Sequence, residues 1–166
     1  TSNSHALALA FAEGAREAGH DVETVSLRGK RIEFCRGCLA CQAGAACPLK
    51  DDAAAIVERI VAADAIAFAT PIYFFEMAGQ MKTLLDRSNP AYAADPAFRD
   101  VYLLATAADE DAHAFDGADE GTARLGRLLR AGTPRGRGDR HGSRCAGRIE
   151  KRLHEVNRAR LMGCGV

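Results

Sequence analysis

The chain has 166 residues, of which 48% are hydrophobic and 27% are charged, and its formal net charge is zero. These values are ordinary for one globular domain, and no run of about 18 apolar residues predicts a membrane span. The charge is divided, because residues 1–121 carry 10 Lys and Arg against 19 Asp and Glu, whereas residues 122–166 carry 12 against 3. The basic segment contains no aromatic residue to stack on a base, so we expect no nucleic-acid partner.

The first predicted element is an amphipathic helix that follows Ser2, Asn3 and Ser4. Apolar residues recur there at intervals of three and four, at Leu7, Phe11, Ala15 and Ala18, which is typical of one buried helical face. Asn3 or Ser4 is a suitable N-cap. The N–H groups of the same first turn could instead hold a phosphate. Both interpretations stay open at this point.

A predicted strand at residues 21–27 leads into a loop that holds four of the six cysteines, spaced Cys35-x2-Cys38-x2-Cys41-x5-Cys47. Three thiolates at intervals of three could wrap one face of a cubane iron–sulfur cluster, and the fourth would close it. Structural zinc also accepts four thiolates, but usually from two well-separated pairs. A redox dithiol and buried cysteines without any ligand are the remaining alternatives. Cysteines this close together favour a metal or redox site in a reducing cytoplasm over a disulfide scaffold.

Helix and strand patterns alternate after the cysteine loop. Asp51 is predicted to cap a helix, and residues 65–69 form a short apolar run that predicts a buried strand ended by Thr70 and Pro71. A helix is predicted from Met77, and a further buried strand at residues 101–105. This alternation predicts an α/β domain with a parallel sheet and right-handed crossovers.

Three aromatic residues, Tyr73, Phe74 and Phe75, follow the strand at residues 65–69. A loop in this place lies at the carboxyl edge of the sheet, where ligands bind in open α/β folds. From the residues alone, the triplet favours core packing at the start of the next helix over a ligand-binding wall.

Beyond residue 121 the strand-like patterns stop. The last 45 residues contain five β-branched residues and no strand-like run, and residues 134–148 show no periodicity. Residues 146–162 could form a polar helix, whereas residues 134–148 are typical of loop or disorder. We therefore expect a domain at residues 1–121 and an atypical basic tail at residues 122–166.

Four motifs in this order resemble the NADPH-dependent FMN reductase family of flavodoxin-like proteins, and within it the iron–sulfur flavoproteins. They are the end of a phosphate loop at Ser2-Asn3-Ser4, the segment Thr70-Pro71-Ile72-Tyr73-Phe74, the helix motif Gly79-Gln80-Met81-Lys82 with Asp86-Arg87, and the segment Thr106-Ala107-Ala108-Asp109. The compact cysteine motif matches the iron–sulfur subgroup. The resemblance covers residues 2–121.

The resemblance implies a flavodoxin-like, doubly wound parallel sheet with FMN at its carboxyl edge. By this resemblance Ser2, Asn3 and Ser4 would hold the FMN phosphate. The isoalloxazine would be lined by Thr70, Pro71, Ile72, Tyr73 and Phe74, and on its other side by Thr106, Ala107, Ala108 and Asp109. A [4Fe–4S] cluster would be held by Cys35, Cys38, Cys41 and Cys47. The aromatic loop accordingly becomes a cofactor wall, and the flavin would do the redox chemistry without a catalytic side chain.

The implied activity is that of a cytoplasmic NAD(P)H-dependent FMN oxidoreductase that passes electrons to a small molecule or a protein, with a homodimer or larger homo-oligomer and no membrane or nucleic-acid partner. The alternative is a non-catalytic electron-transfer flavoprotein or a zinc-stapled FMN-binding module. Two departures from the family accompany these expectations. The first strand and most of the phosphate loop are missing, so we expect the natural protein to continue upstream. The tail lacks the family's valine-rich fifth strand, and a shifted reading frame would give such a segment.

Overall fold

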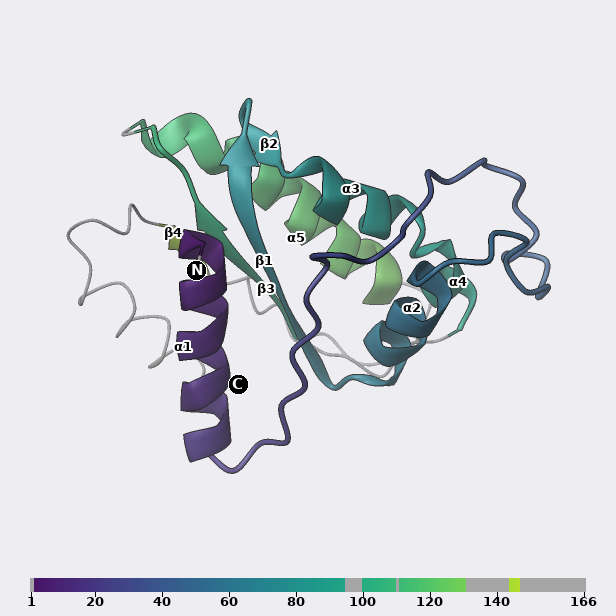
Figure 1. The fold of residues 1–166 in the computed structure, drawn as a ribbon, viewed down its shortest axis with the longest axis horizontal. Helices are drawn as coiled ribbons and strands as arrows, with labels where there is room; N and C mark the ends of the chain where they lie inside the picture. The colour runs from purple at the N-terminus through teal and green to yellow at the C-terminus, as the bar shows by residue number, and fades with distance from the viewer. Residues whose placement is uncertain (1, 95–99, 110, 131–143, 147–166) are drawn as a thin grey trace.

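The computed structural model describes residues 2–94, 100–109, 111–130 and 144–146, and its centre is a small sheet (Figure 1). The strands are β1 (Ala65–Tyr73), β2 (Glu76–Met77), β3 (Asp100–Thr106) and β4 (Arg144–Ala146), in the order β2-β1-β3-β4. β1, β3 and β4 are parallel, whereas the short β2 pairs antiparallel with β1. The β1–β3 ladder runs from Ala65 opposite Asp100 to Pro71 opposite Thr106, so both strands end at the same edge.

Helices cover both faces of this sheet (Figure 1). They are α1 (Asn3–Glu17), α2 (Ala53–Ala62), α3 (Gly79–Asp86), α4 (Asn89–Ala93) and α5 (Asp116–Arg130), with a 3₁₀ turn η1 (Ala112–Phe115) before α5. α1 lies on one face, and the other helices lie on the opposite face. This arrangement confirms the predicted doubly wound α/β class.

Two apolar clusters cover the two faces of the sheet, one on each side. On the α1 side, Leu7, Ala10 and Phe11 pack with Leu104. On the other side, residues of α2 to α5 pack against alternate residues of β1 and β3, including Phe68, Ile72, Val101, Leu103 and Ala105. The alternation follows from the strand geometry, in which successive side chains point to opposite faces. Strands buried on both faces explain the continuous apolar runs in the sequence.

The prediction of a strand at residues 21–27 is wrong, because this segment forms neither a strand nor a helix. Val25 and Leu27 are partly buried against the core, while the residues between and before them are mostly exposed. A β-strand requires a neighbour to accept and donate its backbone hydrogen bonds. Among the described residues, no strand lies beside this segment. Its alternating apolar side chains pack against the core without any strand pairing.

β1 is longer than predicted and continues through Thr70 and Pro71 to Tyr73. Proline lacks an N–H group but its carbonyl still accepts, and here the Pro71 oxygen accepts from the Ala78 N–H at 3.2 Å. Pro71 therefore sits near the end of the strand, where a missing donor is tolerated. The strand then turns directly into β2, and α3 begins at Gly79 rather than at Met77.

The N-terminus of α1 differs from the prediction by its cap residue. Ser2, with an extended backbone, is the N-cap, and its side chain makes no capping hydrogen bond. At the other end, Gly19 has φ +92°, and the N–H of His20 donates to the carbonyl of Ala15. This left-handed residue ends the helix in the way that glycine commonly does after a last helical turn.

The C-terminal segment is more ordered than the sequence predicts where the structure describes it. α5 spans Asp116–Arg130, so the expected boundary at residues 121/122 lies inside this helix. β4 pairs with β3 in parallel, so the expectation of a tail without any strand is wrong at Arg144–Ala146. Residues 131–143 and 147–166, including most of the predicted helix at 146–162, lie outside the described residues. None of the described helices combines the length and the apolar character that crossing a bilayer requires.

Candidate functional site

The carboxyl edge of the sheet brings two of the predicted binding segments together. Pro71 lies opposite Thr106 in the β1–β3 ladder, so the Thr70–Phe74 and Thr106–Asp109 segments lie side by side at this edge. Thr106 is buried, Ala107 is half-buried, and Ala108 and Asp109 are exposed. The Asp109 carboxylate accepts the N–H of Asp111 at 3.0 Å, which folds this segment back toward η1.

The first turn of α1 reaches the same edge. The Phe11 and Tyr102 rings lie 5.3 Å apart, and Leu7, one turn earlier in the helix, packs in the same cluster as Leu104, two residues later in the strand. α1 therefore runs antiparallel to β3, and its N-terminal end points toward the carboxyl end of that strand (Figure 1). The three segments assigned to FMN by the resemblance thus converge, although they are separated by more than thirty residues each.

The aromatic triplet forms an exposed hairpin rather than part of the core. Tyr73 is paired with Glu76, which leaves Phe74 and Phe75 as the two-residue turn between β1 and β2. Their φ angles are +51° and +65°, and two such residues in a tight hairpin are usually Asn and Gly. Phe74 is 99% exposed, and Tyr73 and Phe75 are each 61% exposed. The core interpretation favoured by the residues alone is therefore wrong, and strained, exposed rings are typical of a functional site.

Thr70 holds the entrance to this hairpin. Its side chain is buried, its hydroxyl donates to the Pro71 carbonyl at 2.9 Å, and it accepts from the Ala78 N–H at 3.0 Å. Ile72, in contrast, points into the core cluster. Of the residues expected to line a flavin, Thr70 and Ile72 therefore shape the turn from inside, while Tyr73 and Phe74 present their rings outside it.

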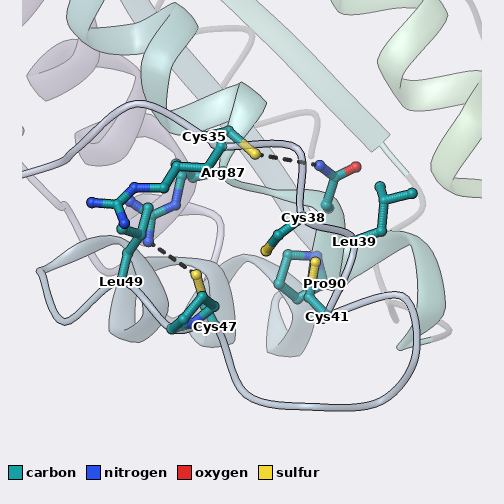
Figure 2. A pocket seen from close by; sticks show the side chains of 11 residues that line it. Cys35, Cys38, Leu39, Cys41, Cys47, Leu49, Arg87 and Pro90 are labelled. Atoms are coloured by element: carbon teal, nitrogen blue, oxygen red, sulfur yellow. Dashed lines mark hydrogen bonds between the residues drawn. The ribbon is translucent and has the colours of Figure 1, made fainter.

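The four cysteines line a hollow between the loop at residues 35–47 and the start of α4 (Figure 2). All four are free thiols, with Cys35 and Cys38 exposed and Cys41 and Cys47 half-buried. Gly37 and Gly44 have φ +63° and +80°, which lets the loop curl in a way that other residues rarely allow. In Figure 1 the loop projects beside α2 and α4, apart from the aromatic hairpin.

A buried ion pair anchors the cysteine loop to the end of α3. Arg87 and Asp51 have side chains only 2% and 0% exposed, and Arg87 binds the carboxylate at 2.6 Å through Nη1 and at 3.0 Å through Nη2. Nη1 also donates to the Glu33 carbonyl at 2.9 Å, and Nη2 donates to the Cys47 sulfur at 3.4 Å. Such a buried pair is tolerated because every charged group has several partners.

The pKa of Asp51 is lowered from 3.8 to about 2. Burial by itself raises it, but the hydrogen bond from Arg87, the N–H donors of Glu33 and Ala53 and the positive charge of Arg87 outweigh burial. The same pair raises the pKa of Arg87. The N-cap residue of α2 is Asp52 rather than the predicted Asp51. The Asp51 carboxylate still accepts the Ala53 N–H at 3.1 Å, and through Arg87 it links the helix, the loop and α3.

The donor set at the cysteine loop fits an iron–sulfur cluster in its chemistry, because four free thiols face one hollow and such clusters are held by four thiolates. Within the described ranges, however, no three His, Cys, Asp or Glu side chains are arranged to hold a metal ion.

The doubly wound arrangement of helices around the parallel strands β1, β3 and β4 is that of a flavodoxin-like protein. The model of the NADPH-dependent FMN reductase family matches residues 1–137, and the chain belongs to this family. An iron-sulfur flavoprotein of Archaeoglobus fulgidus is 41% identical over 81 residues, which cover 49% of this chain and 40% of that protein. An iron-sulfur flavoprotein of Methanocaldococcus jannaschii is 38% identical over 74 residues, which cover 45% and 38%. The chain thus matches well under two thirds of the length of these relatives.

Solved structures confirm the predicted fold class. An NAD(P)H:quinone oxidoreductase from Methanothermobacter marburgensis has a TM-score of 0.71 and 25% identity, over 99% of this chain and 89% of that chain. The azoreductase AzrA has a TM-score of 0.62 at 14% identity, again over 99% and 89%. The second likeness concerns the fold alone.

Sequence reasoning missed Arg87 and Asn89, which face the thiols across the hollow, and the buried pairing of Arg87 with Asp51. Arg87 appeared only as the end of a motif, Asp51 only as a helix cap, and Asn89 not at all. Asn89 donates from Nδ2 to the Cys35 sulfur at 3.9 Å. No local signal could have paired these residues, because 36 residues separate Asp51 from Arg87 and 54 separate Cys35 from Asn89.

Proposed function

We propose that this chain carries the FMN site of an NAD(P)H-dependent oxidoreductase. The observation that carries the proposal is the convergence of three separate segments at one edge of the sheet: the first turn of α1, the hairpin after β1 and the segment after β3. In open α/β sheets, ligands bind outside the carboxyl ends of the strands. Membership of the FMN reductase family supports FMN as the ligand.

In this proposal each segment has a distinct role. The N–H groups at the start of α1, with Ser2, Asn3 and Ser4, bind the phosphate, because a helix N-terminus offers free donors and a partial positive charge. The Tyr73 and Phe74 rings cover the isoalloxazine and exclude water, and residues 106–109 close its other side. Bound FMN supplies the hydride and one-electron chemistry, so the protein has to bind and orient the ring and its electron donor.

We further propose that Cys35, Cys38, Cys41 and Cys47 hold a [4Fe–4S] cluster, which exchanges single electrons with a small-molecule or protein acceptor. The names of the matched relatives, which are iron-sulfur flavoproteins, support this assignment. The close spacing of these cysteines also fits a reducing compartment such as the cytoplasm. The exposed hairpin aromatics, once they hold a flavin, offer an apolar surface that a second copy of the chain could cover.

FMN binding by the hairpin is tested with Phe74→Ala, measured as quenching of flavin fluorescence during titration with FMN. Phe74 is almost fully exposed, so its truncation removes no core packing. Aromatic stacking contributes on the order of 1–3 kcal/mol, and we expect FMN affinity to fall roughly tenfold or more. The matched control is Phe34→Ala, which removes another ring, 81% exposed, from the start of the cysteine loop.

Equal affinities for both variants and the wild type would contradict the assignment of this edge to FMN. Anaerobic addition of NADPH to the FMN-bound protein then tests turnover. Bleaching of the flavin absorption is the expected result for a reductase. A flavin that binds but is not reduced by NADPH would instead identify an electron carrier.

A further inference from the structure

Two nitrogen donors face the cysteine thiols from the segment that follows α3. The Arg87 Nη2 lies 3.4 Å from the Cys47 sulfur, and the Asn89 Nδ2 lies 3.9 Å from the Cys35 sulfur. Both residues line the hollow with all four cysteines (Figure 2). The two donors are only two residues apart in the chain, yet they reach the first and the last thiol of the motif. The hollow therefore has thiols on one side and N–H groups on the other.

The orientation of Arg87 is determined by its other partners. Asp51 takes one hydrogen bond from each terminal nitrogen, and the Glu33 carbonyl takes another from Nη1. These acceptors fix the plane of the guanidinium, so that a remaining donor of Nη2 is directed at Cys47. Because the side chain is only 2% exposed, water does not screen this donor as it would at the surface.

We propose that Arg87 and Asn89 are positioning residues of the thiolate site, and that their N–H groups stabilise its more reduced state by donating to the Cys47 and Cys35 sulfurs. The inference rests on the cluster assigned under the proposed function. One-electron reduction by dithionite adds one negative charge to such a site, with no bond formed or broken in the protein. Hydrogen bonds to the sulfurs favour the more negative state and so raise the reduction potential.

The test compares the midpoint potentials of anaerobically purified full-length chains, reduced stepwise with dithionite and followed by electron paramagnetic resonance. Asn89→Leu removes one donor at a half-buried position without adding a charge. Arg87→Lys keeps a cation beside Asp51 but loses the two-pronged geometry that directs Nη2 at sulfur. At a fixed potential, we expect the ratio of reduced to oxidised sites to fall severalfold in each variant. A tenfold fall corresponds to about 59 mV for a one-electron couple.

Arg36→Gln is the matched control. Arg36 lines the same hollow, but its guanidinium donates to the Glu33 carboxylate at 3.3 Å and its side chain is 69% exposed. If direct N–H donation to sulfur sets the potential, loss of this screened charge should change the ratio of reduced to oxidised sites less than twofold. A shift in Arg36→Gln as large as that in Asn89→Leu would overturn the inference, because general electrostatics would then explain it.

Iron and acid-labile sulfide analysis of each protein distinguishes a failure of the cluster assignment from a failure of the role inferred for Arg87 and Asn89. A wild-type chain that holds zinc or no metal overturns the cluster assignment, and the inference falls with it. A wild-type chain with a full cluster, but with unchanged midpoints in Asn89→Leu and Arg87→Lys, overturns the inference alone. Asn89→Leu keeps the test decisive if Arg87→Lys does not fold.

Discussion

At the scale of single residues, Arg87 and Asp51 form a buried ion pair that several further partners hold in place. Removing one partner from a buried ion pair leaves an uncompensated charge, which usually costs about 3–5 kcal/mol. Here the pair also carries the contacts to Glu33 and Cys47, so it couples the stability of the fold to the shape of the thiol hollow.

Asp51 gives the stability a defined pH dependence. Its pKa is about 2 in the folded chain against 3.8 for the unperturbed group, so its stabilisation is complete above pH 3.8 and is lost as the pH falls toward 2. The shift corresponds to about 2 kcal/mol, of which about 1 kcal/mol is lost between pH 5 and pH 3. Urea unfolding at these two pH values measures it. Asp51→Asn should not show this loss of unfolding free energy between pH 5 and pH 3. An equal loss in that variant would contradict the assignment of the pH dependence to Asp51.

The Thr70 hydroxyl should contribute measurably to stability. Thr70→Val keeps the shape of the side chain but removes its hydrogen bonds with Pro71 and Ala78, which should lower the free energy of unfolding by about 1–2 kcal/mol. The control is Thr83→Val, because the Thr83 hydroxyl donates only to the Gly79 carbonyl four residues earlier in the same helix, a contact of little net value. Urea unfolding of both variants should separate them, and equal losses would argue against a special role for Thr70.

At the scale of elements, α5 supports the aromatic hairpin. A Cβ on Gly117 would lie 2.7 Å from the Glu76 Oε1 and 2.8 Å from the Phe75 carbonyl oxygen, so only glycine allows the helix to approach the turn this closely. The Glu76 side chain can move, but the Phe75 oxygen belongs to the backbone. The position of the hairpin is therefore set by the contact with α5 as well as by its own pairing.

Gly117→Ala should displace the hairpin and weaken FMN binding. Overpacking of this kind costs about 1–3 kcal/mol, and the turn that carries Tyr73 and Phe74 would have to move. Gly121→Ala is the control in the same helix, since a Cβ there meets nothing within 4 Å, and it should stabilise the helix by roughly 0.5–1 kcal/mol. Thermal unfolding and FMN titration of both variants test this. A Gly117→Ala protein as stable and as FMN-competent as Gly121→Ala would refute the role of the contact.

At the scale of the whole molecule, the proposed flavin site is made by segments that belong to different layers. α1 lies on one face of the sheet, whereas the hairpin contacts α5 on the other face. A ligand that touches both should bind the folded chain and not the unfolded one. Binding of that kind raises the free energy of unfolding of the entire domain and does not stabilise one loop alone.

FMN should therefore raise the temperature of unfolding in proportion to the logarithm of its concentration. At a hundredfold excess over the dissociation constant, the gain in free energy of unfolding is about 2.7 kcal/mol. Differential scanning fluorimetry with an extrinsic dye, at several FMN concentrations, measures the shift. Riboflavin, which lacks the phosphate, should give a smaller shift, and equal shifts for both would argue against phosphate binding by the first turn of α1.

The sequence by itself determined the types of the main elements and the carboxyl-edge position of the aromatic residues. Periodicity reports local burial, which is why α1, α2, β1 and β3 were predicted close to their observed places. It failed at residues 21–27, because an apolar alternation does not reveal whether a neighbouring strand is present to pair with it. The cysteine spacing likewise indicated a thiol site without showing what faces the thiols.

Only the tertiary structure decided which distant residues meet. The pairing of Pro71 with Thr106, the reach of Arg87 to Asp51 and Cys47, and the close approach of Gly117 to the hairpin all join segments that are far apart in the chain. The same applies to Tyr73 and Phe74, whose apolar character suggested the core until the two-residue turn placed them outside it. Composition measures how much a side chain gains from burial, whereas chain connectivity and packing decide whether a buried place exists for it.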